Sequence, residues 1–158
     1  MNILIKKNFY LFILFYSLLA IFFALYIEHI LGYKACKLCL YQRVPYIIAI
    51  FISFIGYNYS KNYKILILIV IIFLISALIS GYHYGIENSI FEEFSGCTSE
   101  NTNITDKLDL LNTLKKTMPS CKNVDFKLFG LSLATINLII SLIISAISIT
   151  LIKYEKNK

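Results

Sequence analysis

The stretch ILILIVIIFLISALISGYHYGI, residues 65–86, contains no Lys, Arg, Asp or Glu. Its serines and tyrosines are scattered and do not recur with a period of 3.6 residues, so they form no polar face. This excludes a surface helix of a water-soluble protein. A helix crosses a bilayer with about 20 mostly apolar residues. The stretch therefore predicts a transmembrane helix.

Three more charge-free runs have the same character: Phe9–Ile27, Val44–Ser60 and Leu128–Ile152. Only 15% of the 158 residues are charged and 58% are hydrophobic, whereas a soluble domain carries about 25% charged residues. We predict an all-α membrane protein, a single domain over residues 1–158 that folds as a bundle of four transmembrane helices with two outer loops. The predicted helices cover about 9–27, 40–60, 65–83 and 129–152, and the outer loops cover about 28–39 and 84–128.

The first run is preceded by Lys6 and Lys7, as in a signal peptide. Its apolar part is longer than the roughly 7–15 residues of a signal peptide, and no clear small-x-small cleavage site follows. We therefore expect it to remain as the first helix.

The net charge of +6 is distributed by loop. Seven lysines and Glu155 lie in the N-terminus, the connection between the second and third runs, and the C-terminal tail, which gives 7 − 1 = +6. The other two loops hold eight basic and eight acidic residues. Basic residues collect on the cytoplasmic side of a membrane. The pattern predicts cytoplasmic termini and removes the need for a nucleic-acid partner to explain the charge.

With this orientation all four cysteines lie on the outer side or at its boundary: Cys36, Cys39, Cys97 and Cys121. An even set of cysteines confined to an oxidising compartment favours disulfide chemistry. Zinc is the rival, but the 24-residue spacing of the second pair lacks the compact repeat of usual zinc modules. A purely structural pair of disulfides also stays open.

The segment CKLCLYQR, residues 36–43, places the only arginine of the chain one helical turn after Cys39. On a helix Cys39 and Arg43 share a face, so the guanidinium could favour a thiolate or hold an electron-rich oxygen ligand. The alternative for Arg43 is a snorkelling residue at the membrane flank. His83 should lie near the level of Arg43 and could line a cofactor pocket, and His29 is a weaker candidate of the same kind.

The outer loop contains TNITDKLDLLNTLKK, residues 102–116, whose apolar residues can share one side of a short helix. Thr105 is its candidate N-cap and Pro119 its stop signal. Such a helix would lie in the membrane interface or pack on neighbouring helices.

Together these segments resemble the DsbB family of disulfide bond formation proteins. The matching pieces occur in family order and cover nearly the whole chain: CKLCLYQR at 36–43, GYHYGIE at 81–87, Cys97, PSC at 119–121 and LFGLSLATIN at 128–137. The resemblance implies a thiol:quinone oxidoreductase of the bacterial inner membrane, with ubiquinone or menaquinone as electron acceptor and no metal.

The resemblance also implies an electron path. A reduced DsbA-like periplasmic oxidant would attack the Cys97–Cys121 disulfide at Cys97. Electrons would then pass to the Cys36–Cys39 pair, through an inter-loop Cys36–Cys121 bond. Cys39 would reduce the quinone, with Arg43 and His83 at the quinone site.

Some features depart from the family pattern. The chain has no tryptophan, and Ala134 and Ile136 stand where relatives often have Pro or Gly and an aromatic. The second loop is compact, which leaves the identity of the partner open. Two other functions remain as alternatives: a vitamin K epoxide reductase-like quinone reductase, whose active pair usually comes later in the chain, and a non-catalytic subunit stapled by disulfides.

Overall fold

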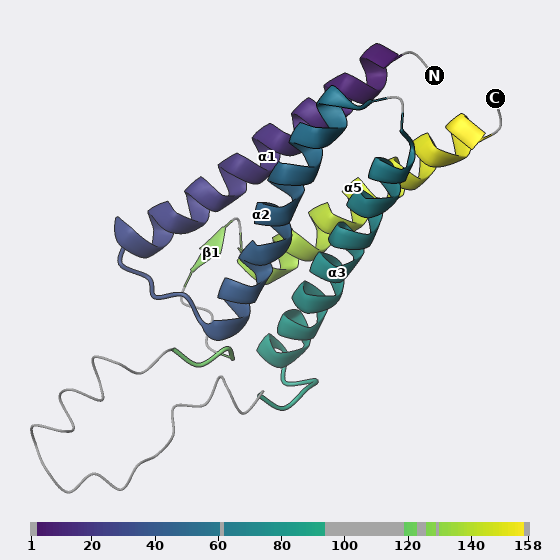
Figure 1. The fold of residues 1–158 in the computed structure, drawn as a ribbon. Helices are drawn as coiled ribbons and strands as arrows, with labels where there is room; N and C mark the ends of the chain where they lie inside the picture. Colours follow the sequence, from purple (N-terminus) through teal and green to yellow (C-terminus); the bar gives the residue numbers. More distant parts are fainter. Residues whose placement is uncertain (1–2, 61, 94–118, 123–125, 129, 157–158) are drawn as a thin grey trace, which may run out of the picture.

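Four long helices make up almost all of the structure, a computed structural model that describes residues 3–60, 62–93, 119–122, 126–128 and 130–156. Each helix is long and apolar enough to cross a membrane. Figure 1 shows them side by side, with the N- and C-terminal ends of the bundle at the same end. The predicted four-helix membrane fold is confirmed. The helices are α1 (Ile3–His29), α2 (Lys37–Asn58), α3 (Lys64–Glu87) and α5 (Leu133–Lys156).

The helix boundaries differ from those predicted because charged and capping residues take part in the helices. α1 begins at Ile3 and so includes Lys6 and Lys7. α2 begins at Lys37, because the Cys36 sulfur accepts a hydrogen bond from the Cys39 N–H at 3.2 Å and caps the first turn. A side-chain acceptor at this position satisfies a backbone donor that has no partner within the helix.

The last helix begins at Leu133, later than the predicted start at about 129. Two short antiparallel strands precede it, β1 (Lys127–Leu128) and β2 (Leu131–Ser132). Gly130 lies between them with a φ of 81°, a conformation that glycine adopts at little cost. The hairpin therefore replaces the expected first turn of the helix.

The helices pack in chain order, α1 on α2, α2 on α3, and α3 on α5. At the end of the bundle that holds the termini, α1 is tied to α5 by an ion pair between Lys6 Nζ and Glu155 Oε1 at 2.6 Å. Large apolar side chains cover the outside of the bundle, for example Phe22 and Leu78, which are about 70% exposed. This arrangement suits a bilayer, in which the surroundings are as apolar as leucine.

The centre of the bundle contains a neutral polar network. Asn137 Nδ2 donates to Ser80 Oγ at 2.7 Å, and the Asn137 side-chain oxygen accepts from the Tyr46 hydroxyl. Ser141 donates to Ser76 at 3.1 Å and to Asn137 at 3.2 Å. These residues come from α2, α3 and α5 and are buried. Small hydroxyl residues let helices approach closely and hydrogen-bond in apolar surroundings.

Three predictions fall outside the described residues: the helix over 102–116, its N-cap Thr105, and the position of Cys97.

Candidate redox site

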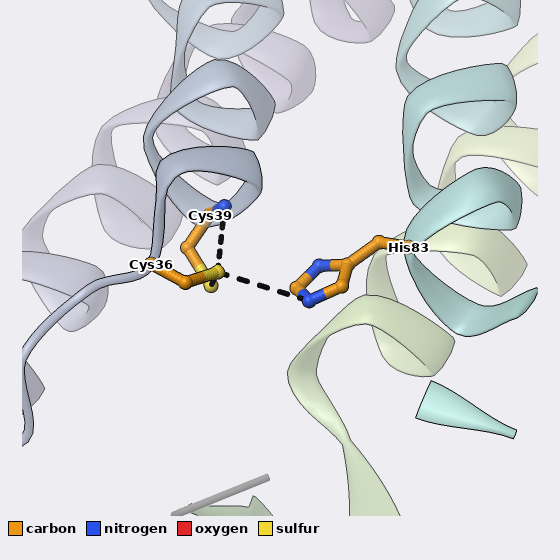
Figure 2. Close-up of side chains that lie close together, drawn as sticks. All are labelled: Cys36, Cys39 and His83. Carbon is orange, nitrogen blue, oxygen red and sulfur yellow. Dashed lines mark hydrogen bonds between the residues drawn. The ribbon is translucent and has the colours of Figure 1, made fainter. Parts of the chain in front are cut away.

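Cys36 and Cys39 lie at the start of α2, at the end of the bundle opposite the termini (Figure 1). Both are free thiols, and their sulfur atoms are 2.7 Å apart (Figure 2). A disulfide has sulfur atoms about 2.05 Å apart, so oxidation of this pair requires a movement of less than about 1 Å. The cap geometry therefore brings the two sulfurs into position for reversible disulfide formation.

Cys36 is the thiol whose surroundings favour ionisation. Its side chain is buried, and its sulfur lies 3.8 Å from His83 Nε2 and 3.2 Å from the Cys39 N–H. The pKa of Cys36 is lowered from 9.0 to about 5, chiefly because the hydrogen bond shared with Cys39 favours the thiolate. His83 lowers this pKa further through its hydrogen bond and charge, whereas burial opposes both effects. The surroundings of the Cys36 sulfur, which faces His83, therefore favour its thiolate form.

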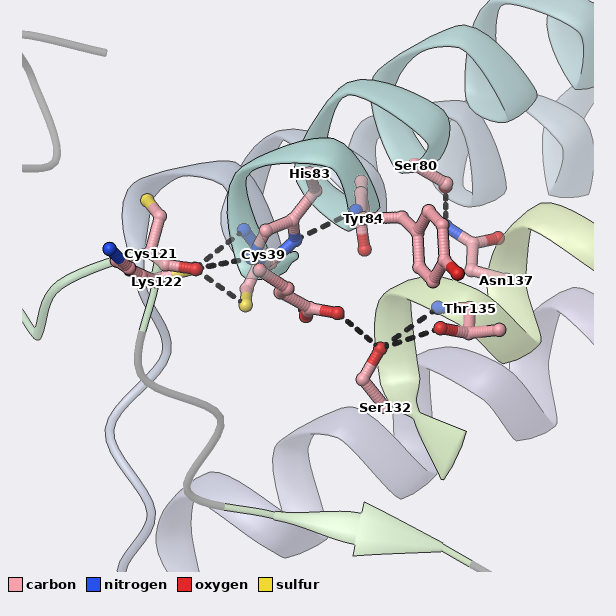
Figure 3. Close-up of polar contacts among 12 residues, drawn as sticks. Cys39, Ser80, His83, Tyr84, Cys121, Lys122, Ser132, Thr135 and Asn137 are labelled. Carbon is pink, nitrogen blue, oxygen red and sulfur yellow. Dashed lines mark hydrogen bonds and ion pairs between the residues drawn. The ribbon is translucent and has the colours of Figure 1, made fainter. Parts of the chain in front are cut away.

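His83 reaches this site from the last turns of α3. Its Nε2 lies 3.2 Å from the Cys121 backbone oxygen and 3.7 Å from Glu87 Oε1, while its Nδ1 lies 3.0 Å from the Gln42 side-chain nitrogen (Figure 3). The sequence suggested a place near Arg43 for His83 but did not identify Gln42 or Glu87 as neighbours. The helical spacing of four between His83 and Glu87 was the available signal for the second of these contacts.

His29 is exposed at the end of α1 and is not among the side chains that line the cavity described below.

Cys121 is disulfide-bonded and almost completely buried. It belongs to one apolar cluster with Cys36, Leu38 and Ile86, against which Cys39 also packs. Thus the second outer loop returns onto the first cysteine pair, although 85 residues separate Cys36 from Cys121 in the sequence.

Glu93 holds the base of the second loop together. Its Oε1 accepts hydrogen bonds from the Lys122 backbone N–H at 2.8 Å and from the Ser120 hydroxyl. Both donors adjoin Cys121. The two ends of the loop are therefore joined beside the buried cysteine, and this contact was not predicted from the sequence.

Arg43 lies one turn beyond Cys39 on α2, as the sequence spacing suggested. Both side chains line the cavity that is described below. The Nη1 atom of Arg43 forms an ion pair with Glu28 Oε2 of α1 at 2.6 Å. The two side chains are only 18% and 27% exposed. The guanidinium is therefore held between helices beside the cysteine pair, whereas a snorkelling residue would extend freely into water.

A cavity of about 410 Å³ opens beside these residues. Its polar wall contains Cys36, Cys39, Arg43 and His83. Its apolar walls come largely from α1 and α5, at the end of the bundle opposite the Lys6–Glu155 ion pair. Among the apolar lining residues are Leu19, Phe23, Leu133 and Ile136.

A second hollow of about 520 Å³ lies between α2 and α3 and is lined by apolar and tyrosine side chains. It contains none of the predicted site residues. The predicted site residues Cys36, Cys39, Arg43 and His83 therefore gather at the first cavity.

The geometry of the two sulfurs bears on the rival zinc interpretation. The ligand atoms of Cys36, Cys39 and His83 all lie within 4.8 Å of one another, a spacing that an ion could bridge. Two thiolates on one tetrahedral zinc ion, however, are about 3.8 Å apart, since each Zn–S bond is about 2.3 Å. The observed 2.7 Å favours thiol–disulfide chemistry at this pair.

Comparison with known proteins gives one family and one curated relative. Residues 6–151 match the family described as "Disulfide bond formation protein DsbB". A protein of Rickettsia prowazekii (strain Madrid E), described as "Uncharacterized protein RP370", is 30% identical over 131 residues, which cover 80% of this chain and 76% of that protein.

Proposed function

The chain belongs to the DsbB family of disulfide bond formation proteins, and from this premise we propose that it transfers electrons from a DsbA-like periplasmic oxidant to a membrane quinone. Family membership and the four apolar helices make it a multi-pass bacterial membrane protein and an oxidoreductase of disulfide bond formation. The observation that carries the finer proposal is the burial of Cys36 and Cys121 in one cluster, with Cys39 beside an apolar cavity.

The first part of the path uses the second loop. The thiolate of the reduced partner attacks Cys97 in the Cys97–Cys121 disulfide, and Cys121 leaves as a thiolate. Cys121 then attacks Cys36 in the oxidised first pair, which forms a Cys36–Cys121 bond and frees the Cys39 thiolate. Each step replaces one disulfide by another, so electrons and atoms balance. The contact between Cys36 and Cys121 supports this route, because exchange requires that the sulfurs meet.

The second part of the path uses the cavity. A bound quinone would supply the acceptor for two electrons and two protons. The residues present fit such a ligand, because a thiol and a guanidinium lie at one end of a largely apolar cavity. Arg43 would hold an electron-rich oxygen next to Cys39, and Leu19, Phe23 and Leu133 would contact an isoprenoid tail. The apolar walls exclude water, which strengthens the interaction of Arg43 with developing negative charge.

A strong acceptor is needed because DsbA is a strong oxidant, with a potential of about −120 mV. For a two-electron couple, about 30 mV corresponds to about 1.4 kcal/mol. A quinone dissolved in the membrane would provide this driving force, and it could reach a cavity lined by membrane-spanning helices without crossing water.

The decisive experiment mixes the purified protein, reduced DsbA and a quinone, and follows quinone absorbance. We expect turnover with all three components and none with Cys39→Ser, which lacks the proposed electron donor. Stoichiometric oxidation of DsbA that never consumes quinone would contradict the proposed acceptor and point to another one, whereas no oxidation of DsbA at all would support a disulfide-stapled subunit.

Sidedness is tested separately. The charge distribution supports cytoplasmic termini and periplasmic cysteines. A membrane-impermeant thiol reagent, applied to intact cells after mild reduction, should label Cys97; Cys121 is almost completely buried and does not serve as the reporter. Labelling that requires lysis would refute this orientation.

A further inference from the structure

Glu87, the last residue of α3, is a buried carboxylate with an unusual neighbour. Its side chain is 9% exposed, and among the described residues its ion-pair partner is His83 at 3.7 Å, with no lysine or arginine in that role. Its other oxygen accepts a hydrogen bond from Ser132 at 2.5 Å. A buried carboxylate next to an imidazole stabilises the protonated ring. The carboxylate of Glu87 is therefore placed to support His83 as a proton acceptor, whereas a purely structural ion pair would join Glu87 to a lysine or an arginine.

Gln42 holds the opposite side of the same ring. Its amide lies 3.0 Å from His83 Nδ1, and both side chains are buried. A glutamine amide can donate through its NH2 group or, after a half turn, accept through its oxygen. A base that accepts a proton at Nε2 carries a hydrogen on Nδ1 in both its neutral and its protonated state. The Gln42 side-chain oxygen, brought to Nδ1 by a half turn of the amide, would therefore accept from Nδ1 in both states, while Nε2 continues to face Cys36.

We propose that Cys36, His83 and Gln42 act as nucleophile, base and orienting group, with Glu87 stabilising the protonated ring, so that Cys36 exchanges with the Cys121 disulfide as a thiolate. The roles match the general arrangement in which a base beside the nucleophile is fixed by a third group. Gln42 and Glu87 are positioning residues, because they act through His83. This inference rests on the proposed function and adds Gln42 and Glu87 to the residues that serve it.

The exchange step balances as follows. The Cys36 proton moves to His83 Nε2, and the Cys36 thiolate attacks Cys121. A Cys36–Cys121 bond forms, and the previous partner sulfur of Cys121 leaves as a thiolate. The proposed electron path uses this step in the opposite direction: a thiolate attacks Cys121 in the Cys36–Cys121 bond, a new disulfide of Cys121 forms, Cys36 leaves as a thiolate, and both electrons then reside on the first pair. A thiol of low basicity leaves faster, and the lowered pKa of Cys36 agrees with that role.

Other titratable and charged groups also face Cys36, and the test keeps them constant. Cys39 contacts the Cys36 sulfur directly, as His83 does. Lys34 and Arg43 line the cavity beside it, and Glu28 forms an ion pair with Arg43.

The test measures ionisation of Cys36 directly and does not depend on quinone. The full-length protein, with its first pair reduced, is treated with iodoacetamide over a range of pH, and alkylation of Cys36 is quantified by peptide mass spectrometry. For the unchanged protein we expect a midpoint near pH 5, with reactivity lost below it as the thiolate is protonated.

The variants should raise this midpoint. A nearby opposite charge changes a pKa by about 1–3 units, so we expect Glu87→Gln to raise the midpoint by about one unit or more. His83→Gln should raise it further, Gln42→Leu should raise it because the ring loses its orientation, and Glu87→Asp should restore part of the effect. Glu92→Gln removes an exposed carboxylate from the same region and should leave the midpoint unchanged.

Unshifted midpoints in folded Glu87→Gln and Gln42→Leu proteins would overturn the inference and leave both residues with a structural role. Quinone turnover of the unchanged protein is measured in parallel. Shifted midpoints without any quinone turnover would contradict quinone as the acceptor but still support the roles proposed around Cys36. Failure of the proposed function and failure of this inference can therefore be distinguished.

Discussion

Two buried polar clusters lie in the bundle, and they differ in the kind of group they contain. The central network joins Tyr46, Asn137 and Ser141 through neutral hydroxyl and amide groups. The outer cluster joins thiols, an imidazole and a carboxylate. Neutral networks hold helices together without changing protonation, whereas groups that gain and lose protons perform chemistry. Burial and hydrogen bonding are common to both clusters, and Tyr46 and Asn137 of the central network line the same cavity as the cysteines. The comparison therefore teaches that the presence of thiols, an imidazole and a carboxylate marks the outer cluster as the candidate site.

The largest effect should come from the loop cysteines Cys97 and Cys121, which we propose deliver electrons to the outer cluster. Cys97→Ser should abolish partner oxidation, because the sulfur that the partner attacks is lost. Cys121→Ser should also stop turnover but let a partner–Cys97 mixed disulfide accumulate, which non-reducing electrophoresis can detect. An adduct that forms through Cys121 would reverse the two roles. Normal partner oxidation in both variants would make this pair structural.

Arg43→Ala should have the next largest effect. Loss of one donor that stabilises developing charge typically costs about 2.7–4 kcal/mol, or about 10²–10³ in rate. Steady-state quinone reduction should fall accordingly, while single-turnover partner oxidation should persist. Arg43→Lys should be intermediate, since it keeps the charge but loses the planar fork.

Glu28→Gln is the matched control for Arg43, because it breaks the same ion pair and leaves the guanidinium in place. If Glu28→Gln reduces both rates as much as Arg43→Ala does, Arg43 acts by joining α1 to α2. If Arg43→Ala changes neither rate, the quinone site lies elsewhere.

Glu93→Gln should have a smaller effect, confined to exchange between the loops. A hydrogen bond to a charged group contributes about 1.5–3 kcal/mol, and the neutral amide keeps part of it. We expect exchange between Cys121 and the first pair to slow by about tenfold at most, since about 1.4 kcal/mol is tenfold. Quench-flow alkylation measures this step, with Glu92→Gln as control. A Glu93→Gln protein that exchanges at the unchanged rate would show that the loop base needs no clamp.

Ser141→Ala should have the smallest effect and completes the comparison. Hydrogen bonds between membrane helices contribute about 0.6 kcal/mol on average and about 1.7 at most. Stability to denaturant should fall by about that amount, while quinone reduction and the alkylation midpoint of Cys36 stay unchanged. A marked loss of quinone reduction in this variant would mean that the central network also takes part in the chemistry, so that the two clusters would not differ in function.

The sequence by itself determined the four membrane helices, because a run of about 20 apolar residues is a local property and, as a helix, matches the thickness of the bilayer. It also determined the Cys36–Cys39 pair and the position of Arg43, since spacings of three and four residues fix neighbours within one helical turn. The start of α2 was less evident, because sequence patterns do not mark cysteine as a capping residue.

Only the tertiary structure decided how the outer cluster is assembled. His83 meets Cys36 across 47 positions of sequence, Gln42 meets His83 across 41, and Cys121 enters the same cluster from a separate loop. Such contacts depend on how helices rotate and pack against one another. Ser76, Ser80 and His83 of α3 recur at spacings of four and three and are buried, so the polar spacing indicates which face of the helix turns inward but not which helix that face meets. The polar side chains that set it are few and lie far apart in the chain, so their partners emerge only when the bundle is formed.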